Sequence, residues 1–318
     1  MTNNFRIDLN MDSASRKRQK FKPGSVGLAD FKILNEVGSG ATGIVYKVRH
    51  LDTDEIYAMK KIQMCRQNQS MLMKDLDHPN IIKLHTSFID GDHIYMIMEL
   101  ATKGDLMKRI LDQKKQGRFF SEKELWRTAW SLAKGILFMH ANHVIHRDIK
   151  AMNVFMGENK ELKIGDLGEA RILGTANFLK GKTVGTPLFL APEVTKEDSY
   201  DHRIDIWGYG CLLYHMATLE PPFKANDYEE LTQKIQTRNP KPIIACYSIK
   251  LKDFIFKLLE KRKSKRPFIT EVIDLLSFPN GFKLENPCDI ENYEKVSAVK
   301  LDAKKNVGTG LLHIMDDY

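Results

Sequence analysis

Cysteine is scarce in this sequence, and long apolar runs are missing. None of the four cysteines forms a C-x-x-C pair, which argues against a cysteine metal site or a disulfide framework and favours a reducing compartment. Because no run of about 18 apolar residues occurs, we expect no membrane span. The polar N-terminus lacks the apolar core of a secretory signal, so we expect a cytoplasmic protein.

The composition is that of a globular protein with an excess of basic residues. Hydrophobic residues make up 42% of the 318 positions and charged residues 28%, and the net charge is +8. The basic residues cluster at 16–22 and 261–266, which indicates either solvated surfaces or a docking or import signal. Since no nucleic-acid motif accompanies the charge, we expect no specific nucleic-acid partner.

A glycine-rich turn joins two segments with the alternation of strands. The pattern G-x-G-x-x-G at Gly38, Gly40 and Gly43 also occurs in dinucleotide-binding folds, but there a helix follows it. Here β-branched alternation resumes at Val45 and predicts a hairpin. Glycines at its tip would let backbone amides approach a phosphate group, and a hairpin tip without a ligand is the alternative.

The most informative stretch is residues 143–168. It contains H-R-D-x-K-x-x-N, then a turn, a short apolar run and D-L-G. This spacing predicts that Asp148, Lys150, Asn153 and Asp166 converge from two loops that flank a hairpin. Two carboxylates, an amide and an ammonium suit phosphoryl transfer: a base, two Mg²⁺ ligands and a group that steadies the phosphoryl. A polar turn that matches by chance is the alternative.

In these motifs the chain resembles the eukaryotic protein kinases over about residues 31–278, and within them the NIMA-related group. The resemblance implies an α+β, two-lobe fold and transfer of the γ-phosphoryl of ATP, with Mg²⁺, to protein Ser or Thr. It implies Asp148 as base, Asn153 and Asp166 as metal ligands, and Lys60 on the α- and β-phosphates. The further residues that it implies around ATP are Val37, Gly38, Ser39, Gly40, Gly43, Val45, Ala58, Met98, Glu99, Leu100, Ala101 and Phe155.

The resemblance also implies domain boundaries. A basic, mobile extension at 1–27 would precede a kinase domain at 28–278, with an N-lobe at 28–101 and a C-lobe at 102–278. Residues 279–318 would form a tail of unassigned role. Within the N-lobe, 81–84 and 93–100 are expected to be two strands joined by the turn at 90–92.

One departure from the family concerns the Glu that normally pairs with the strand lysine. The usual spacing lands on Gln69, and no Glu occurs between Glu55 and Glu99. The segment from Lys60 to Pro79 is also short by roughly two to three helical turns. The chain would then be a kinase of reduced activity, a kinase completed by a partner, or one shortened by splicing or a gene-model artefact.

Regulatory and structural positions follow from the resemblance. A phosphate on Thr183 would pair with Arg147, although many relatives carry that residue one position earlier; Thr175 is a weaker candidate. Thr186, expected near Asp148, belongs to the Ser/Thr-kinase pattern. Asp205 would brace the catalytic loop, or be an early-helix charge. Asp105 would touch ribose or substrate, or cap a helix.

Glu193 of A-P-E would pair with Arg266. A further departure from the NIMA-related pattern is Leu188-Phe-Leu-Ala191, where that group is usually richer in aromatic residues. The expected partners are protein substrates with Ser or Thr and an activating kinase or partner. The cytoplasm is the expected location, with the nucleus, cytoskeleton or cilium as alternatives. Two rival functions are a nucleotide-binding scaffold without catalysis and a small-molecule kinase.

Overall fold

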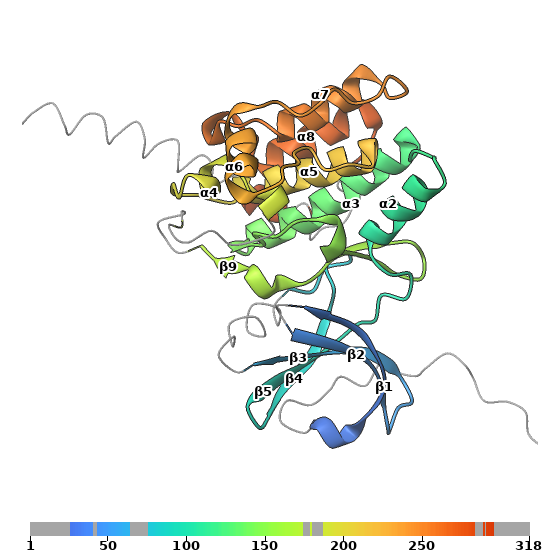
Figure 1. Ribbon diagram of the computed structural model, residues 1–318. Coiled ribbons are helices and arrows are strands. Elements are labelled where there is room, and N and C mark those ends of the chain that lie inside the picture. Colours follow the sequence, from blue (N-terminus) through green and yellow to red (C-terminus); the bar gives the residue numbers. More distant parts are fainter. Residues whose placement is uncertain are drawn as a thin grey trace, which may run out of the picture.

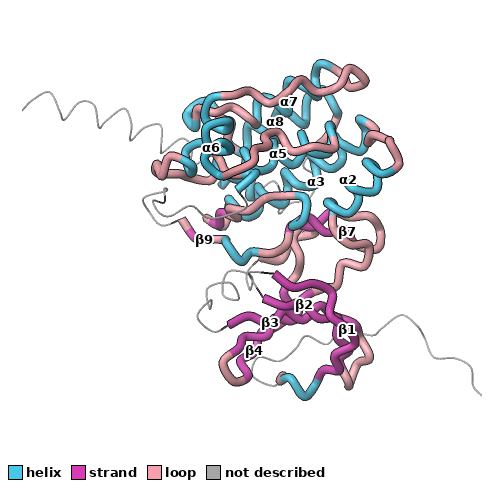
Figure 2. Tube along the Cα trace, in the orientation of Figure 1, coloured by secondary structure: helices cyan, strands magenta, loops and turns pink. Residues whose placement is uncertain are grey.

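The computed structural model describes residues 26–40, 43–63, 76–173, 179, 187–283, 289 and 291–295. Figure 1 shows two parts, a small sheet built by the first third of the chain and a larger helical part built by the rest. Coloured by secondary structure, most strands gather in the small part and the long helices in the large part (Figure 2). This arrangement confirms the α+β, two-lobe fold class.

The small part is one antiparallel sheet of five strands in the order β1-β2-β3-β5-β4. The strands are β1 (Phe31–Gly40), β2 (Gly43–His50), β3 (Ile56–Gln63), β4 (Leu84–Asp90) and β5 (His93–Met98). Alternation sends Lys60 of β3 inward, whereas its neighbour Lys61 lies with its ammonium 5.9 Å from the Tyr95 ring centroid. The expected hairpin of β1 and β2 is confirmed.

One N-lobe expectation was wrong. Of residues 81–84, only Leu84 belongs to the sheet, as the first residue of β4, and Ile81 makes only an isolated bridge to Ile164. The apolar residues Ile81 and Ile82 resemble part of a strand in the sequence, but they are apolar because they are buried against the helical part. The half-exposed residues that follow are the ones that pair with β5.

The helical part consists of seven described α-helices. They are α2 (Leu106–Lys115), α3 (Glu122–Ala141), α4 (Pro192–Thr195), α5 (Arg203–Thr218), α6 (Tyr228–Thr237), α7 (Ile249–Leu258) and α8 (Ile269–Asn280). The predicted capping box opens α3: the Ser121 hydroxyl accepts from the Glu124 N–H, and the Glu124 carboxylate accepts from the Ser121 N–H at 3.0 Å. Among the described residues, no helix is both long and apolar enough to cross a membrane.

Short strands and 3-10 turns make up the remaining elements. Four small strands pair as β6 (Val144–Ile145) with β9 (Arg171–Ile172) and β7 (Val154–Met156) with β8 (Leu162–Ile164). The 3-10 turns are η1 (Leu28–Asp30), η3 (Ala151–Asn153), η4 (Leu167–Glu169), η5 (Pro187–Phe189) and η6 (Lys263–Lys265). The β7–β8 hairpin is the one expected between the two polar loops.

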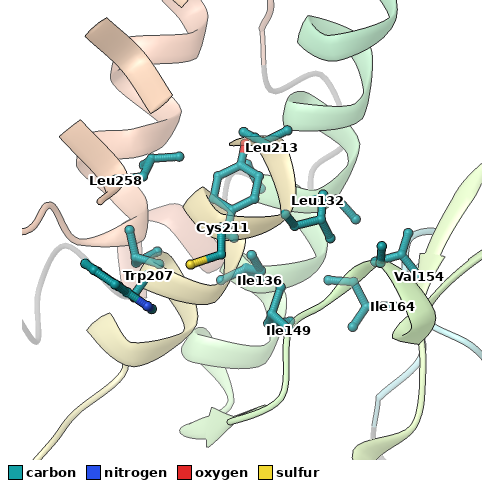
Figure 3. Close-up of a cluster of buried hydrophobic side chains, with 14 of the residues drawn as sticks. Leu132, Ile136, Ile149, Val154, Ile164, Trp207, Cys211, Leu213 and Leu258 are labelled. Carbon is teal, nitrogen blue, oxygen red and sulfur yellow. The ribbon is translucent and has the colours of Figure 1, made fainter. Parts of the chain in front are cut away.

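The largest apolar core joins the long helices to the polar loops. Figure 3 shows side chains from α3, α5 and α7, from β7 and β8, and from the loop before β7 meeting in one cluster. Trp207, Cys211 and Leu258 are fully buried there, as are Val154 and Ile164. Each such side chain stabilises the fold by about 1.5–3 kcal/mol. The loops that carry the polar residues therefore begin and end on a packed base.

Candidate active site

The first polar loop brings together three of the predicted site residues. The Lys150 ammonium contacts Oδ2 of Asp148 at 2.6 Å. The Asn153 amide nitrogen donates to Oδ2 of Asp148 at 3.0 Å and to its backbone oxygen at 2.9 Å. Because Nδ2 makes both bonds, Oδ1 of Asn153 is the atom that can bind a cation. The Asp148 carboxylate is thus held by two donors while its side chain keeps 11% of its exposure.

The second loop contributes Asp166, which faces the lysine of the sheet. Oδ1 of Asp166 lies 2.8 Å from the Lys60 ammonium, across 106 positions of sequence. The Lys60 side chain is only 5% exposed, so its charge requires an acidic or polar partner. Asp166 supplies such a partner by forming an ion pair with the Lys60 ammonium.

The Lys60 contact determines the protonation of Asp166. Burial of the Asp166 carboxyl opposes its ionisation. The Lys60 charge and hydrogen bond, together with His146 and the Gly168 N–H, outweigh burial, so the pKa of Asp166 lies below its ordinary value. Asp166 is therefore an anion at neutral pH, the form that a divalent cation requires.

Asp205, at the start of α5, holds the backbone of the first loop. Its carboxylate accepts hydrogen bonds from the N–H groups of His146 at 2.9 Å and Arg147 at 2.8 Å. The His140 ring lies 2.9 Å from Oδ2 of the same carboxylate. Burial raises the pKa of Asp205, but the His140 bond, His146 and the backbone donor outweigh it, so the net shift is downward. The bracing role expected for Asp205 matches these contacts.

Gly165 leaves no room for a side chain, and Asp166 has an unusual backbone conformation. A Cβ on Gly165 would lie 2.8 Å from Cγ1 of Ile82 and 2.9 Å from Cε2 of Phe155, closer than side chains tolerate. The Gly165 oxygen lies 3.0 Å from Nε2 of His146, and Asp166 follows with a φ of 56°. Asp166 therefore adopts left-handed backbone, which is costly for most residues and turns its side chain toward Lys60.

Apolar residues predicted to surround adenine belong to one hydrophobic cluster. Ala58 of β3 and Met98 of β5 are opposite each other in the sheet. Leu100 and Ala101 follow on the linker to α2, and Phe155 comes from β7. Val45 of β2 packs on the same cluster. Six of the residues expected around adenine thus belong to the cluster that runs through both parts of the molecule.

The side chain of Glu99 ties the linker to the neighbouring segments. Its carboxylate accepts from the Lys83 N–H at 3.0 Å and lies 3.0 Å from the Lys163 ammonium. The side chain therefore joins the linker to β8, which leaves backbone atoms for a purine ring. No spacing in the sequence predicts the Glu99–Lys163 ion pair.

The glycines of the β1–β2 turn fit a phosphate group. A Cβ on Gly38 or Gly40 would meet nothing within 4 Å, so no described part of the protein requires glycine there. Gly43 differs, because its φ is 128° and a Cβ would lie 2.3 Å from the Lys61 oxygen. Val37 and Ser39 complete this exposed stretch of β1. Bare backbone at Gly38 and Gly40 is what close approach to a ligand needs.

The oxygen donors fit Mg²⁺ shared with a nucleotide. No group of three or more His, Cys, Asp or Glu that could hold a metal exists in the described ranges. Mg²⁺ bound with ATP needs only one or two protein oxygens, because phosphates and water supply the rest. Asp166 and Asn153 offer such oxygens; they are also linked through the Gly165 N–H, which donates to the Asn153 backbone oxygen at 2.9 Å.

Two further predicted residues have structural contacts. Asp105 caps α2 by accepting from the Lys108 N–H at 2.8 Å, which supports the capping alternative. Glu193 and Arg266 form two hydrogen bonds of 2.7 and 2.9 Å, with side chains 6% and 0% exposed. Arg266 also donates to the Arg203 backbone oxygen at 2.9 Å. This predicted ion pair connects α4 to the turn before α8.

Several predictions concern residues outside the described ranges. Gln69, Thr175, Thr183 and Thr186 are among them, as is the basic cluster at 16–22. The structure does describe Arg147, whose guanidinium donates to the Glu169 backbone oxygen and, at 3.0 Å, to the Tyr200 hydroxyl. The sequence did not indicate His140 as a partner of Asp205, because a histidine within the apolar face of a helix has the pattern of an ordinary core residue.

Comparison with known proteins gives one family. The family model described as "Protein kinase domain" matches residues 31–276. The chain is 33% identical over 250 residues to serine/threonine-protein kinase Nek3 of Mus musculus, covering 77% of this chain and 48% of that protein. It is 31% identical over 250 residues to Nek5 of Mus musculus, covering 77% of this chain and 40% of that protein.

A plant protein gives a similar match. Serine/threonine-protein kinase Nek3 of Oryza sativa subsp. japonica is 30% identical over 256 residues, covering 77% of this chain and 43% of that protein. The chain thus spans between 40% and 48% of the lengths of these three relatives.

Proposed function

The chain belongs to the protein kinase family, and from this premise we propose that it transfers the γ-phosphoryl group of ATP to Ser or Thr hydroxyls of proteins. The similarity to proteins named as Nek serine/threonine kinases supports the acceptor class. The observation that carries the proposal is the meeting of Lys60, Asp148, Lys150, Asn153 and Asp166 from both parts of the fold.

Asp148 has the surroundings of the general base. Its carboxylate is held by Lys150 and Asn153 but remains partly exposed, so a substrate hydroxyl can approach it. Asp148 also lines a small pocket together with Phe189 and Leu190. Lys150 would steady the transferred phosphoryl group as charge moves across it.

Asp166, Asn153 and Lys60 form the phosphate end of the proposed site. Asp166 and Asn153 would hold Mg²⁺, and Lys60 would contact the phosphates from the sheet. When bound, Mg²⁺ supplies positive charge that neutralises the phosphate oxygens. The low pKa of Asp166 keeps this residue ionised at neutral pH, so it binds the cation without first losing a proton.

A nucleotide-binding scaffold without catalysis is the second candidate function. It is favoured by the missing Glu in the segment after β3, where the expected position is Gln69. Against it, Lys60 has a carboxylate partner in Asp166, and the Asp148 loop retains each of its hydrogen bonds to Asn153. A small-molecule kinase has no observation in its favour.

Radiolabelled ATP with Mg²⁺ and a basic protein substrate tests the proposal. The purified chain should label the substrate, and acid hydrolysis should release phosphoserine or phosphothreonine. Asp148→Asn should lower the rate by about 10²–10⁴-fold, the contribution of a general base. Asp112→Asn, which removes the same charge from an exposed site on α2, should leave the rate unchanged. Equal labelling by Asp148→Asn and wild type would favour the scaffold.

The cellular setting is a finer part of the proposal. The resemblance to NIMA-related kinases leads us to place the activity in cell-cycle, cytoskeletal or ciliary regulation, with the protein in the cytoplasm. An activating kinase acting on Thr183 would complete this scheme. Mass spectrometry of the chain isolated from dividing and resting cells should detect phosphate on Thr183 in the active fraction only.

A further inference from the structure

A buried carboxylate follows the residues that match the kinase family. Asp289 lies beyond the matched range of 31–276, and its side chain is 2% exposed. Oδ1 of Asp289 is 2.8 Å from Nε2 of His78, whose side chain is 1% exposed. Oδ2 lies 3.8 Å from the Lys134 ammonium of α3. A residue 211 positions away thus binds the loop that enters β4.

The hydrogen bonds of His78 give the bond to Asp289 a direction. The Asn80 N–H donates to Nδ1 of His78 at 3.0 Å, so Nδ1 is an acceptor. The ring proton therefore lies on Nε2 and points at Asp289. His78 also packs against Phe138 of α3 with ring centroids 5.0 Å apart. Asp289 thus fixes both the proton position and the orientation of the ring.

From His78 the contacts continue to the metal-ligand loop. The Asn80 side chain donates to the Leu162 oxygen at 2.8 Å, and the Ile164 N–H donates to the Asn80 oxygen at 2.8 Å. The Ile82 N–H in turn donates to the Ile164 oxygen at 2.8 Å. Because β8 ends at Ile164, these bonds hold the backbone two residues before Asp166.

The neighbours of Asp289 in sequence are also attached to the helical part. Phe282 stacks on Trp130 of α3 with centroids 5.1 Å apart and planes 8° apart. The Tyr293 hydroxyl donates to the Asp274 carboxylate of α8 at 2.8 Å. Asn292 is buried at 4% exposure. Asp289 therefore bonds to His78 from a base anchored on α3 and α8.

Stabilisation of the fold alone does not explain why a carboxylate is buried at Asp289. Burying an ionised carboxylate is costly, and an apolar side chain of similar volume usually stabilises a fold as well or better. What a hydrogen-bonded carboxylate adds is orientation, as in metal sites where a carboxylate fixes a histidine. The ring that Asp289 orients is that of His78, from which hydrogen bonds lead through Asn80 and β8 toward Asp166.

We propose that Asp289 is a positioning residue for phosphoryl transfer, acting through His78, Asn80 and β8 on the placement of Asp166. The functional part of this inference rests on the proposed kinase activity. The segment after the kinase-family match is then part of the catalytic unit, and the catalytic unit extends at least to Asp289.

The test compares three variants of the full chain. Asp289→Leu removes the acceptor, and Asp289→Asn keeps an oxygen that can accept from His78. Glu291→Gln is the matched control, because Glu291 lies two positions on but is 66% exposed and pairs only with Lys295 among the described residues. We measure kcat, KM for ATP and the Mg²⁺ concentration that gives half-maximal rate.

Asp289→Leu should lower kcat about tenfold and raise the Mg²⁺ requirement, with KM for ATP changed less than twofold. Asp289→Asn should recover most of the loss, and Glu291→Gln should match wild type. A lower melting temperature with unchanged kcat and Mg²⁺ requirement would overturn the proposal. Equal defects in the Leu and Asn variants would also overturn it, because the oxygen retained in Asp289→Asn would then make no difference to the rate.

Hydrogen exchange separates the coupling from the activity. In Asp289→Leu, amides of residues 80–82 and 162–165 should exchange at least about tenfold faster, while peptides from α7 stay unchanged. If wild type transfers no phosphoryl group, the proposed function fails, but this exchange result still decides the coupling. Unchanged exchange at 162–165 would overturn the coupling even in an active kinase.

Should Asp289→Leu fail to fold, His78→Phe carries the same predictions, because it retains a ring packed on Phe138 and removes the bonds of His78 to Asp289 and Asn80. Failure of both variants to fold would assign Asp289 a purely structural role and overturn the proposal.

Discussion

Asp205→Asn is expected to lower the free energy of unfolding by about 3–5 kcal/mol and kcat by at least about 100-fold. Two carboxylate oxygens of Asp205 receive donors from His140, His146 and Arg147 at 2.8–2.9 Å. An amide has one oxygen, so in either orientation at least one donor faces an NH₂ group. A stranded buried donor costs about 1–3 kcal/mol.

The remaining hydrogen bonds weaken as well. Each loses the charge of its acceptor, which reduces its contribution from about 1.5–3 to about 0.5–1.5 kcal/mol. Two such bonds and one stranded donor add up to about 3–6 kcal/mol, which covers the stated range. The rate falls because His146 and Arg147 carry the backbone that ends in Asp148, and a displacement of about 1 Å can cost about 100-fold.

Urea unfolding and steady-state phosphorylation measure the two effects on the same preparation. Asp253→Asn, an exposed carboxylate on α7, serves as the control for loss of charge. An Asp205→Asn variant within about 1 kcal/mol of wild type, with unchanged kcat, would refute the reasoning, because the three hydrogen bonds would then contribute neither stability nor placement.

Three other variants follow from single contacts. Glu193→Gln should cost about 3–5 kcal/mol in urea unfolding, because it leaves the buried Arg266 charge with a neutral partner; a loss below 1 kcal/mol would contradict this. Lys60→Met should lower kcat/KM for ATP by about 10²–10³-fold and raise the pKa of Asp166 toward its ordinary value, read from the acid limb of the rate profile; an unshifted limb would speak against the Lys60–Asp166 contact. Burial lowers the pKa of His215 from 6.5 to about 4, so its neutral form stabilises the fold fully above pH 6.5, and about 3 kcal/mol is lost as the pH falls to about 4. His215→Leu should lack that part of the pH dependence, and an identical pH profile would count against it.

The loop from His146 to Asn153 and the sheet were predictable because their signals are local. His146 to Asn153 and Asp166 to Gly168 are short ordered patterns, and the alternation around Lys60 distinguishes its face from that of Lys61. The Glu193–Arg266 ion pair also followed from the resemblance, although it spans 73 positions. Its two residues stand in recognisable motifs.

Other features depend on packing that no local pattern encodes. The strand expected at 81–84 was wrong because Ile81 and Ile82 are apolar for contact with the helical part. The bond between His78 and Asp289 joins residues 211 positions apart, and Asp289 lies in a polar stretch that gave no pattern. The Lys60–Asp166 contact was also missed, since the resemblance directs attention to a Glu that this sequence lacks.

The central claim is that Asp148 and Asp166 act together on the terminal phosphoryl group of Mg-ATP, and a rapid-quench single turnover tests it most directly. With enzyme in excess over labelled ATP, wild type should move the γ-phosphoryl to protein Ser or Thr as fast as ADP appears. Asp148→Asn should bind the same ATP but transfer at least about 100-fold more slowly. Equal transfer rates for the two proteins, or no transfer by wild type, would contradict the account.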